Sequence, residues 1–184
     1  MRKITFLTVL VVLANHFAIA QTSLPTPKNI TATYAKKTRS EDGYPGKNYW
    51  QNSADYEINV NFNPTTRLLN GNEEITYYNN SNDTLREIVF KLYPNIYKKG
   101  SPRLMKFEDE DTNEGMNIES MSINNSVVNA NNWFINATNM SVRIQPLLPK
   151  QSMKFTIQFS YTLNKGSHMR TGQIDDGAFF IAYF

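Results

Sequence analysis

The stretch MKFTIQFSYTL, residues 153–163, decides the fold class of this chain. Apolar and polar residues alternate strictly along it, so six apolar side chains face one way: Met153, Phe155, Ile157, Phe159, Tyr161 and Leu163. Full burial of each is worth roughly 1.5 to 3 kcal/mol, so the whole face represents about ten kcal/mol or more of gross stabilisation. This stabilisation is gained only if a second layer of structure covers the strand.

A second segment with a period of two predicts another strand with one apolar face, at Tyr56, Ile58, Val60 and Phe62. We expect this strand to be half-buried and to end at Pro64. The pair Asn70-Gly71 predicts a tight hairpin turn, because both residues tolerate positive φ.

The remaining segments supply further short strands and turns. Strands are predicted at Ile75–Tyr78, Leu85–Leu92, Ile118–Ile123 and Val127–Ile135, with turns at Asn79–Asp83 and Asn124–Asn125 and loops at Tyr97–Pro102 and Glu108–Gly115. No segment shows a convincing helical period of 3.6 that could cover the long strand. The sequence therefore predicts an all-β, two-layer antiparallel β-sandwich.

The N-terminus has the sequence pattern of an export signal. A charged start, Met1-Arg2-Lys3, precedes a short apolar run and the cleavage pattern Ala18-Ile19-Ala20. The run is too short to span a bilayer, and no later stretch approaches spanning length. We expect residues 1–20 to be a signal peptide, 21–48 a polar extended lead-in, and 49–184 the sandwich domain, exported to the periplasm or secreted after cleavage near Ala20.

The C-terminus is almost wholly apolar from Ala178 to Phe184. An unpaired apolar strand at a chain end is an aggregation hazard. We expect that the domain is incomplete here and stops within a structural element. A terminal strand paired in the sheet interior is an equally good interpretation.

Charge and composition exclude several classes of function. Without Arg2 and Lys3 the chain has 17 basic and 16 acidic residues, so it lacks the concentrated basic face that nucleic-acid binding needs. Cysteine is absent, which excludes disulfides, thiolate catalysis and cysteine-bound zinc. The two histidines are His16, inside the expected signal, and His168.

An ordered set of motifs resembles the N-terminal domain of aminopeptidase N-like zinc metallopeptidases, particularly exported bacterial members. The motifs are Tyr49-Trp50-Gln51-Asn52, Asp55-Tyr56, Leu69-Asn70-Gly71, Ile75-Thr76-Tyr77-Tyr78-Asn79-Asn80-Ser81 and Leu92-Tyr93-Pro94-Asn95. Residues 142–163 resemble the closing hairpin of that domain, with a turn at Leu148-Pro149 and Lys150 where the family often has glycine. The resemblance spans residues 49–184 and rests on structural motifs.

The resemblance implies a non-catalytic role for this chain. In the family, the sandwich packs against a catalytic domain and walls one side of the peptide-binding cleft. The full-length enzymes of the family hold zinc with H-E-x-x-H and a downstream glutamate. This sequence contains no H-E-x-x-H motif. We therefore expect no catalytic residue, no metal ligand and no cofactor in this chain, and its substrate-binding residues stay unknown. The expected partners are the catalytic domain and, in that context, a peptide substrate.

Other clusters have ordinary structural interpretations. The acidic run Glu108–Glu114 matches no calcium loop and is expected to be a solvated loop. Ser167 and His168 are adjacent loop residues, which do not form a hydrolase triad. The pairs Lys36-Lys37 and Lys98-Lys99 are expected to be ordinary surface.

Aromatic residues and glycosylation-like triplets also occur. We expect core or cross-strand packing, and not a sugar-stacking platform, for the aromatic residues Tyr49, Trp50, Tyr56, Tyr77, Tyr78 and Trp133. Asparagine-rich composition makes chance N-x-S/T matches common, at Asn29, Asn79, Asn82, Asn124, Asn136 and Asn139. A free-standing exported sandwich that binds a peptide, a glycan or a partner protein is the alternative function, since a sandwich can host unrelated functions.

Overall fold

The computed structural model describes residues 24–167 and 170–182 and divides the chain into two compact units that meet between Tyr49 and Trp50. The expected signal peptide and His168 lie outside the described residues. The unit boundary falls one residue after the boundary expected from the sequence.

The first unit contains a short helix, α2 (Lys28–Ala35), so the expectation of an extended lead-in is wrong over these residues. The helix starts after Pro27, whose carbonyl accepts a hydrogen bond from the Thr31 amide at 3.0 Å. None of its residues is buried. Hydrophobic periodicity therefore had no apolar face to detect.

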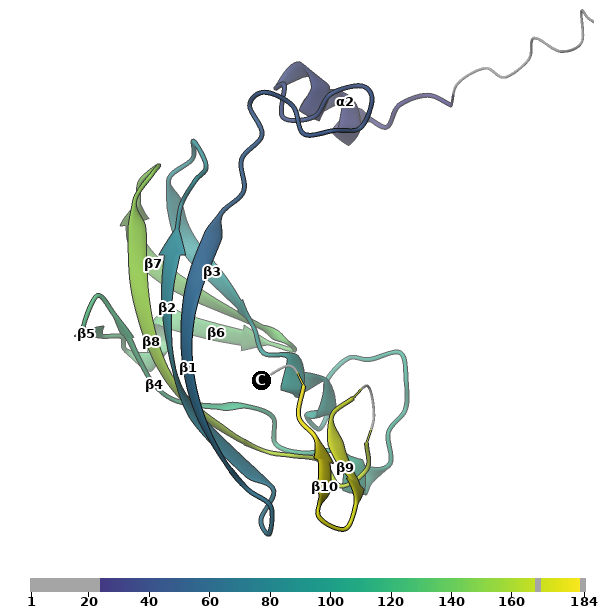
Figure 1. The fold of residues 1–184 in the computed structure, drawn as a ribbon. Helices are drawn as coiled ribbons and strands as arrows, with labels where there is room; N and C mark the ends of the chain where they lie inside the picture. Colours follow the sequence, from purple (N-terminus) through teal and green to yellow (C-terminus); the bar gives the residue numbers. More distant parts are fainter. Residues whose placement is uncertain (1–23, 168–169, 183–184) are drawn as a thin grey trace, which may run out of the picture. The chain divides into compact units, whose positions relative to one another are not determined.

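The second unit is an all-β sandwich, as the alternating pattern predicted (Figure 1). One layer is a five-stranded sheet in the order β1-β2-β8-β4-β5, and the other is a three-stranded sheet in the order β3-β7-β6. All strand pairs are antiparallel. The strands of the first sheet are β1 (Ser53–Asn63), β2 (Leu68–Tyr78), β8 (Ser152–Thr162), β4 (Asn117–Ile123) and β5 (Ser126–Val127).

The second layer and the connections complete the unit. The strands of the second layer are β3 (Leu85–Lys91), β7 (Asn139–Leu147) and β6 (Trp133–Asn136). The 3-10 turns are η1 (Tyr93–Tyr97), η2 (Asp109–Asp111) and η3 (Ala130–Asn132). A separate two-stranded sheet joins β9 (Gly172–Asp175) to β10 (Ala178–Phe180). In the described part of the chain, no helix has the length and apolar character needed to cross a bilayer.

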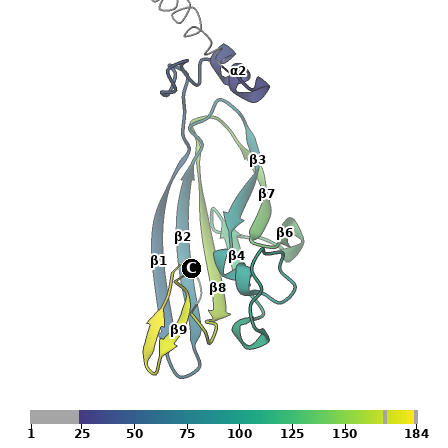
Figure 2. The same ribbon diagram turned by 90° about the vertical axis from the view of Figure 1, so that its right-hand side faces the viewer.

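The core lies between the two layers, which face each other in Figure 2. All six apolar side chains of the 153–163 stretch are buried, and Phe155 and Leu163 are fully inaccessible. From the opposite layer, Met140 and Val142 are equally inaccessible, and Phe90 meets Phe155 edge to face at 5.2 Å. The three-stranded sheet thus supplies the cover that the long strand requires.

The Asn70-Gly71 pair lies inside β2, so the predicted hairpin turn there is wrong. Gly71 pairs with Val60 on one side and with Phe159 on the other. A Cβ atom at Gly71 would lie 2.8 Å from Phe159 Cζ, so this glycine makes room for a core ring. The turn between β1 and β2 lies at residues 64–67 and includes Arg67 at φ 57°.

Two further predictions about connections need correction. The closing hairpin implied by the resemblance does not form, because β7 and β8 belong to different sheets and their connection passes from one layer to the other. The single strand expected over 127–135 is divided by η3, where Asn129 Oδ1 accepts a hydrogen bond from the Asn131 amide at 2.9 Å. In contrast, the turn at Asn124-Asn125 is confirmed, with φ values of 48° and 67°.

Two buried asparagines of the family-like motifs, Asn79 and Asn95, form hydrogen bonds to backbone groups. Asn79 is inaccessible to solvent, and its Nδ2 donates to the carbonyls of Asp83 and Leu147 at 2.8 and 3.0 Å. Asn95 is also inaccessible, and it donates to Ala137 O at 3.0 Å while its Oδ1 accepts from the Met116 amide at 2.7 Å. These side chains satisfy buried backbone groups where strands end.

Residue 150 takes the left-handed backbone conformation that favours glycine. Lys150 has φ 64°, and its amide donates to Asn79 O at 2.7 Å. Its Nζ donates to Asn80 O at 2.6 Å. The glycine that resembling sequences often place here is therefore the residue this turn would accommodate with least strain.

The apolar C-terminal stretch pairs outside the two main sheets. Within the described residues, β10 pairs with β9 and not with an interior strand of either layer. Phe179 packs against Phe62 at 5.0 Å between ring centroids. This hairpin thereby covers one end of the inward face of β1.

Candidate interaction surface and cavity

The middle of β1 carries an apolar face that the described residues leave uncovered. Tyr56, Ile58 and Val60, which we call the β1 face, are 61%, 43% and 45% exposed. The sequence predicted this strand correctly, but its expected half-burial is wrong. Only Ala54 and Phe62, near the two ends of the strand, pack against the core.

The outer edge of β1 is also unpaired within the described residues. β1 stands first in the order of its sheet and pairs only with β2. Its eleven residues contain neither proline nor lysine, the residues that commonly protect an edge strand. Its two acidic residues, Asp55 and Glu57, alternate with the β1 face and so point to the other side of the sheet. An open apolar face beside an open edge is typical of a protein interaction surface.

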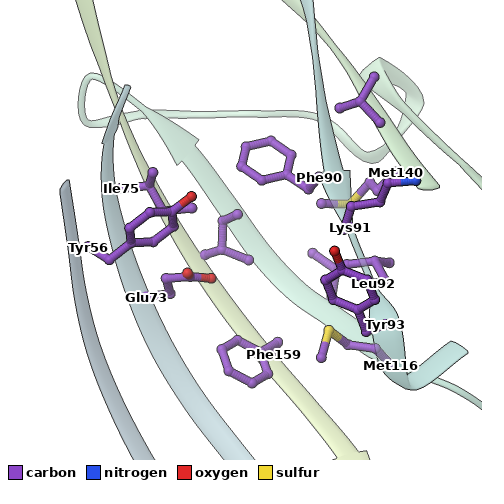
Figure 3. Close-up of a pocket in the computed structure, with 13 residues that line it drawn as sticks. Tyr56, Glu73, Ile75, Phe90, Lys91, Leu92, Tyr93, Met116, Met140 and Phe159 are labelled. Carbon is purple, nitrogen blue, oxygen red and sulfur yellow. The ribbon is translucent and has the colours of Figure 1, made fainter. Parts of the chain in front are cut away.

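A cavity of about 350 Å³ opens between the two layers beside the β1 face (Figure 3). Apolar side chains from both sheets line it, with Ile75 and Phe159 from the five-stranded sheet, Phe90 and Met140 from the three-stranded sheet, and Met116 just before β4. Polar atoms reach it from Tyr56, Glu73, Lys91 and Tyr93. We call this space the Glu73 cavity.

Glu73 is the exception on the inward face of β2. The inward positions of this strand are occupied by Leu69, Gly71, Glu73, Ile75 and Tyr77. The neighbours of Glu73 across the sheet are also apolar, Ile58 on β1 and Ile157 on β8. Burial raises the pKa of the Glu73 carboxyl, because the apolar surroundings disfavour its charged form.

The adjacent Glu74 illustrates the ordinary behaviour of a strand carboxylate. It points to the outer face of the sheet, and its Oε2 lies 2.8 Å from Lys154 Nζ. No hydrogen bond or ion pair within the described residues involves the Glu73 carboxylate in this way. The Lys91 amine on the opposite wall donates to Asn139 Oδ1 at 2.5 Å. Figure 3 shows the Lys91 nitrogen pointing away from Glu73.

Tyr56 connects the β1 face to the Glu73 cavity. Its ring belongs to the exposed face, and it also lines the cavity. Burial raises the pKa of the Tyr56 hydroxyl, with further contributions from Glu73 and Tyr77. Figure 3 shows the Tyr56 and Glu73 side chains on the same side of the cavity.

The acidic run at 108–114 is only partly the solvated loop that the sequence predicted. Glu108, Asp109 and Glu114 are exposed, but Asp111 is 9% exposed. Asp111 Oδ1 accepts a hydrogen bond from the Gly166 amide at 2.5 Å. This carboxylate therefore anchors the loop that follows β8. Among the described residues, no three His, Asp or Glu side chains gather as a metal-binding group.

The aromatic residues singled out in the sequence have separate positions. Tyr77 and Trp133 pack against the core, which agrees with the structural interpretation. Tyr78 lies on the outer face and donates a hydrogen bond to Asp55 Oδ2 at 2.8 Å. Tyr49 and Trp50 are 52% and 41% exposed. Of the N-x-S/T asparagines, Asn79 is buried and therefore closed to glycosylation in the folded domain.

Sequence reasoning missed Glu73, although a signal was present. Alternation along β2 places position 73 on the same face as Ile75 and Tyr77, where a carboxylate is unexpected. The mistaken turn at Asn70-Gly71 concealed this signal, because residue 73 was then expected to lie outside a strand. The cavity itself depends on how β3 faces β2, which no local pattern contains.

Comparison with known proteins gives only a distant structural similarity. No family model matches the sequence, and no curated protein matches it. Among solved structures, the chain is similar to an M1 zinc metallopeptidase from Deinococcus radiodurans, at 16% identity and a TM-score of 0.43, over 66% of this chain and 23% of that one. A mutant of that enzyme bound to a Tyr-Ser-Ala substrate matches at the same identity and TM-score, over 67% of this chain and 23% of that chain. The chain thus spans about a quarter of the length of these enzymes.

Proposed function

We propose that this chain is a non-catalytic, exported β-sandwich domain of an aminopeptidase N-like zinc metallopeptidase, and that it packs against the catalytic domain through the β1 face. The observation that carries the proposal is the uncovered apolar middle of β1 beside its unpaired edge. The ordered motif set at residues 49–95 supports the choice of family. Peptide hydrolysis and zinc belong to the catalytic domain in this proposal.

The residues of this chain do not fit a catalytic zinc site. The sequence has no H-E-x-x-H motif, and outside the expected signal peptide its only histidine is His168. Two imidazole ligands cannot be assembled from one histidine. The chain alone is therefore expected to show no zinc-dependent cleavage of aminoacyl reporter substrates.

The docking surface is tested by removing its apolar character. The double variant Ile58→Thr/Val60→Thr keeps β-branched residues in the strand while it lowers the apolar area. Hydrophobic dye binding and self-association, measured by fluorescence and sedimentation, are expected to fall in this variant. Val127→Thr is the matched control, because Val127 is 86% exposed on β5, away from the β1 face. Equal dye binding and a monomeric state in all three proteins would refute the docking surface.

The family assignment is tested by sequencing genomic DNA beyond the codon for Phe184. An open frame, or one restored by a single shift, that leads to H-E-x-x-H supports the proposal. Unrelated sequence directly after a stop codon contradicts it and favours the second candidate.

The second candidate function is a free-standing exported binding module. The Glu73 cavity favours it, because a concave space that combines apolar side chains with a few polar groups is typical of ligand sites. Recovery of a stable secreted product of the mature length together with a bound peptide, glycan or partner protein would support this candidate. Degradation of that product would contradict it.

A further inference from the structure

We propose that the Glu73 cavity binds a small organic cation with an apolar body, such as an aryl-alkyl ammonium ion, with its charged head on Glu73. This site goes beyond the docking role, because the carboxylate lies on β2 and the cavity extends between the two layers.

The first argument is the position of the charge. Glu73 stands among apolar neighbours on the inward face of the sheet, and it makes no ion pair within the described residues. A carboxylate in such surroundings loses hydration without gaining a partner. A cationic ligand supplies that partner, and a charge-assisted hydrogen bond is about twice as strong as a neutral one.

The second argument is the shape and chemistry of the walls. The space of about 350 Å³ has the size of a small ligand site, and Phe159, Phe90 and Met116 offer aromatic and thioether surface for an apolar body. The Lys91 amine, which also belongs to the cavity lining, donates to Asn139 and points away from Glu73 in Figure 3. The cavity thus presents the Glu73 carboxylate beside apolar side chains, with the Lys91 amine directed elsewhere, which favours cations over neutral and anionic molecules of similar shape.

The test uses the full chain and three probes that share a 2-phenylethyl body: 2-phenylethylamine, 2-phenylethanol and 3-phenylpropionate. Binding is measured by calorimetry and by the NMR signals of the methionine methyl groups. The amine is expected to bind in about the millimolar range. It should bind at least about tenfold more tightly than the alcohol, the low end of what a charge-assisted hydrogen bond provides. The propionate should bind more weakly than the alcohol.

The location of the probe is read from individual methionines. Signals from Met116 and Met140, which line the cavity, are expected to shift, whereas that from Met105, which is 51% exposed elsewhere, should stay unchanged. Shifts of Met105 alone would overturn the assignment of the site.

The variant Glu73→Gln keeps the shape of the side chain and removes its charge. It is expected to bring the ratio of amine to alcohol affinity to about one while alcohol binding is retained, which also reports that the cavity is intact. Glu74→Gln is the matched control, because the adjacent carboxylate pairs with Lys154 on the outer face. The proposal is overturned if the intact chain shows no preference for the amine, or if Glu73→Gln keeps the preference.

Discussion

Strands β1 and β8 carry the same alternating pattern and have opposite surroundings. On β8, the inward side chains from Met153 to Tyr161 are all at most 6% exposed. On β1, the inward side chains Tyr56, Ile58 and Val60 are 43% to 61% exposed. Both strands lie in one sheet, separated by β2. The difference shows that alternation reports a strand with an apolar face, whereas the cover of that face depends on the position of the strand in the sheet.

The largest expected loss of stability comes from a substitution on the buried strand, β8. Phe155→Ala removes a fully inaccessible ring that meets Phe90 edge to face. We expect the free energy of unfolding to fall by about 3 to 5 kcal/mol, from lost transfer energy and the remaining cavity. The matched change on the other strand, Ile58→Ala, is expected to cost less than about 1 kcal/mol. Denaturant unfolding at low protein concentration measures both, and similar losses would mean that the β1 face is covered in solution.

The second prediction concerns β2, the strand between the two faces. Gly71→Ala places a Cβ atom 2.8 Å from Phe159 Cζ and 3.0 Å from Asn59 O. We expect a loss of about 1 to 3 kcal/mol from overpacking, measured by denaturant unfolding. Asn70→Ala on the opposite face should cost no more than about 0.5 kcal/mol. A loss at Asn70 as large as at Gly71 would instead indicate the hairpin turn that the sequence alone predicted.

The third and smallest effect tests a polar atom on the buried face of β8. Tyr161 is 3% exposed, and its hydroxyl has no hydrogen-bond partner among the described residues. Tyr161→Phe is therefore expected to raise the free energy of unfolding by about 1 kcal/mol at neutral pH, because it removes an unsatisfied buried group.

This variant also changes the dependence of stability on pH. Burial, with a contribution from Tyr97, raises the pKa of Tyr161 from 10.0 to about 12. The unfolded chain loses this proton at lower pH than the folded chain does. The free energy of unfolding is therefore unaffected by this titration below pH 10, and it falls as the pH rises from 10 through about 12. Thermal unfolding between pH 9 and 12 should show a smaller decline for Tyr161→Phe than for the parent chain. Identical declines would contradict this origin.

The sequence-based prediction was most successful where a pattern is local. The 153–163 stretch, the strand at 117–123 and the turn at Asn124-Asn125 follow from alternation and from side chains that tolerate positive φ. It failed at Gly71 on β2, because the need for glycine comes from the ring of Phe159 on the neighbouring strand β8. It also failed for α2, which has no apolar face to produce a period.

For this protein, the amino-acid sequence by itself determined the all-β class and the need for a second layer, because a strand period and its apolar face are properties of consecutive residues. Only the tertiary structure decided which apolar face is covered, that β7 and β8 lie in opposite layers, and that Glu73 borders a cavity. These features depend on segments far apart in the chain that meet through the sheet order and the facing of the two layers. The alternation of consecutive residues contains no information about contacts between such distant segments.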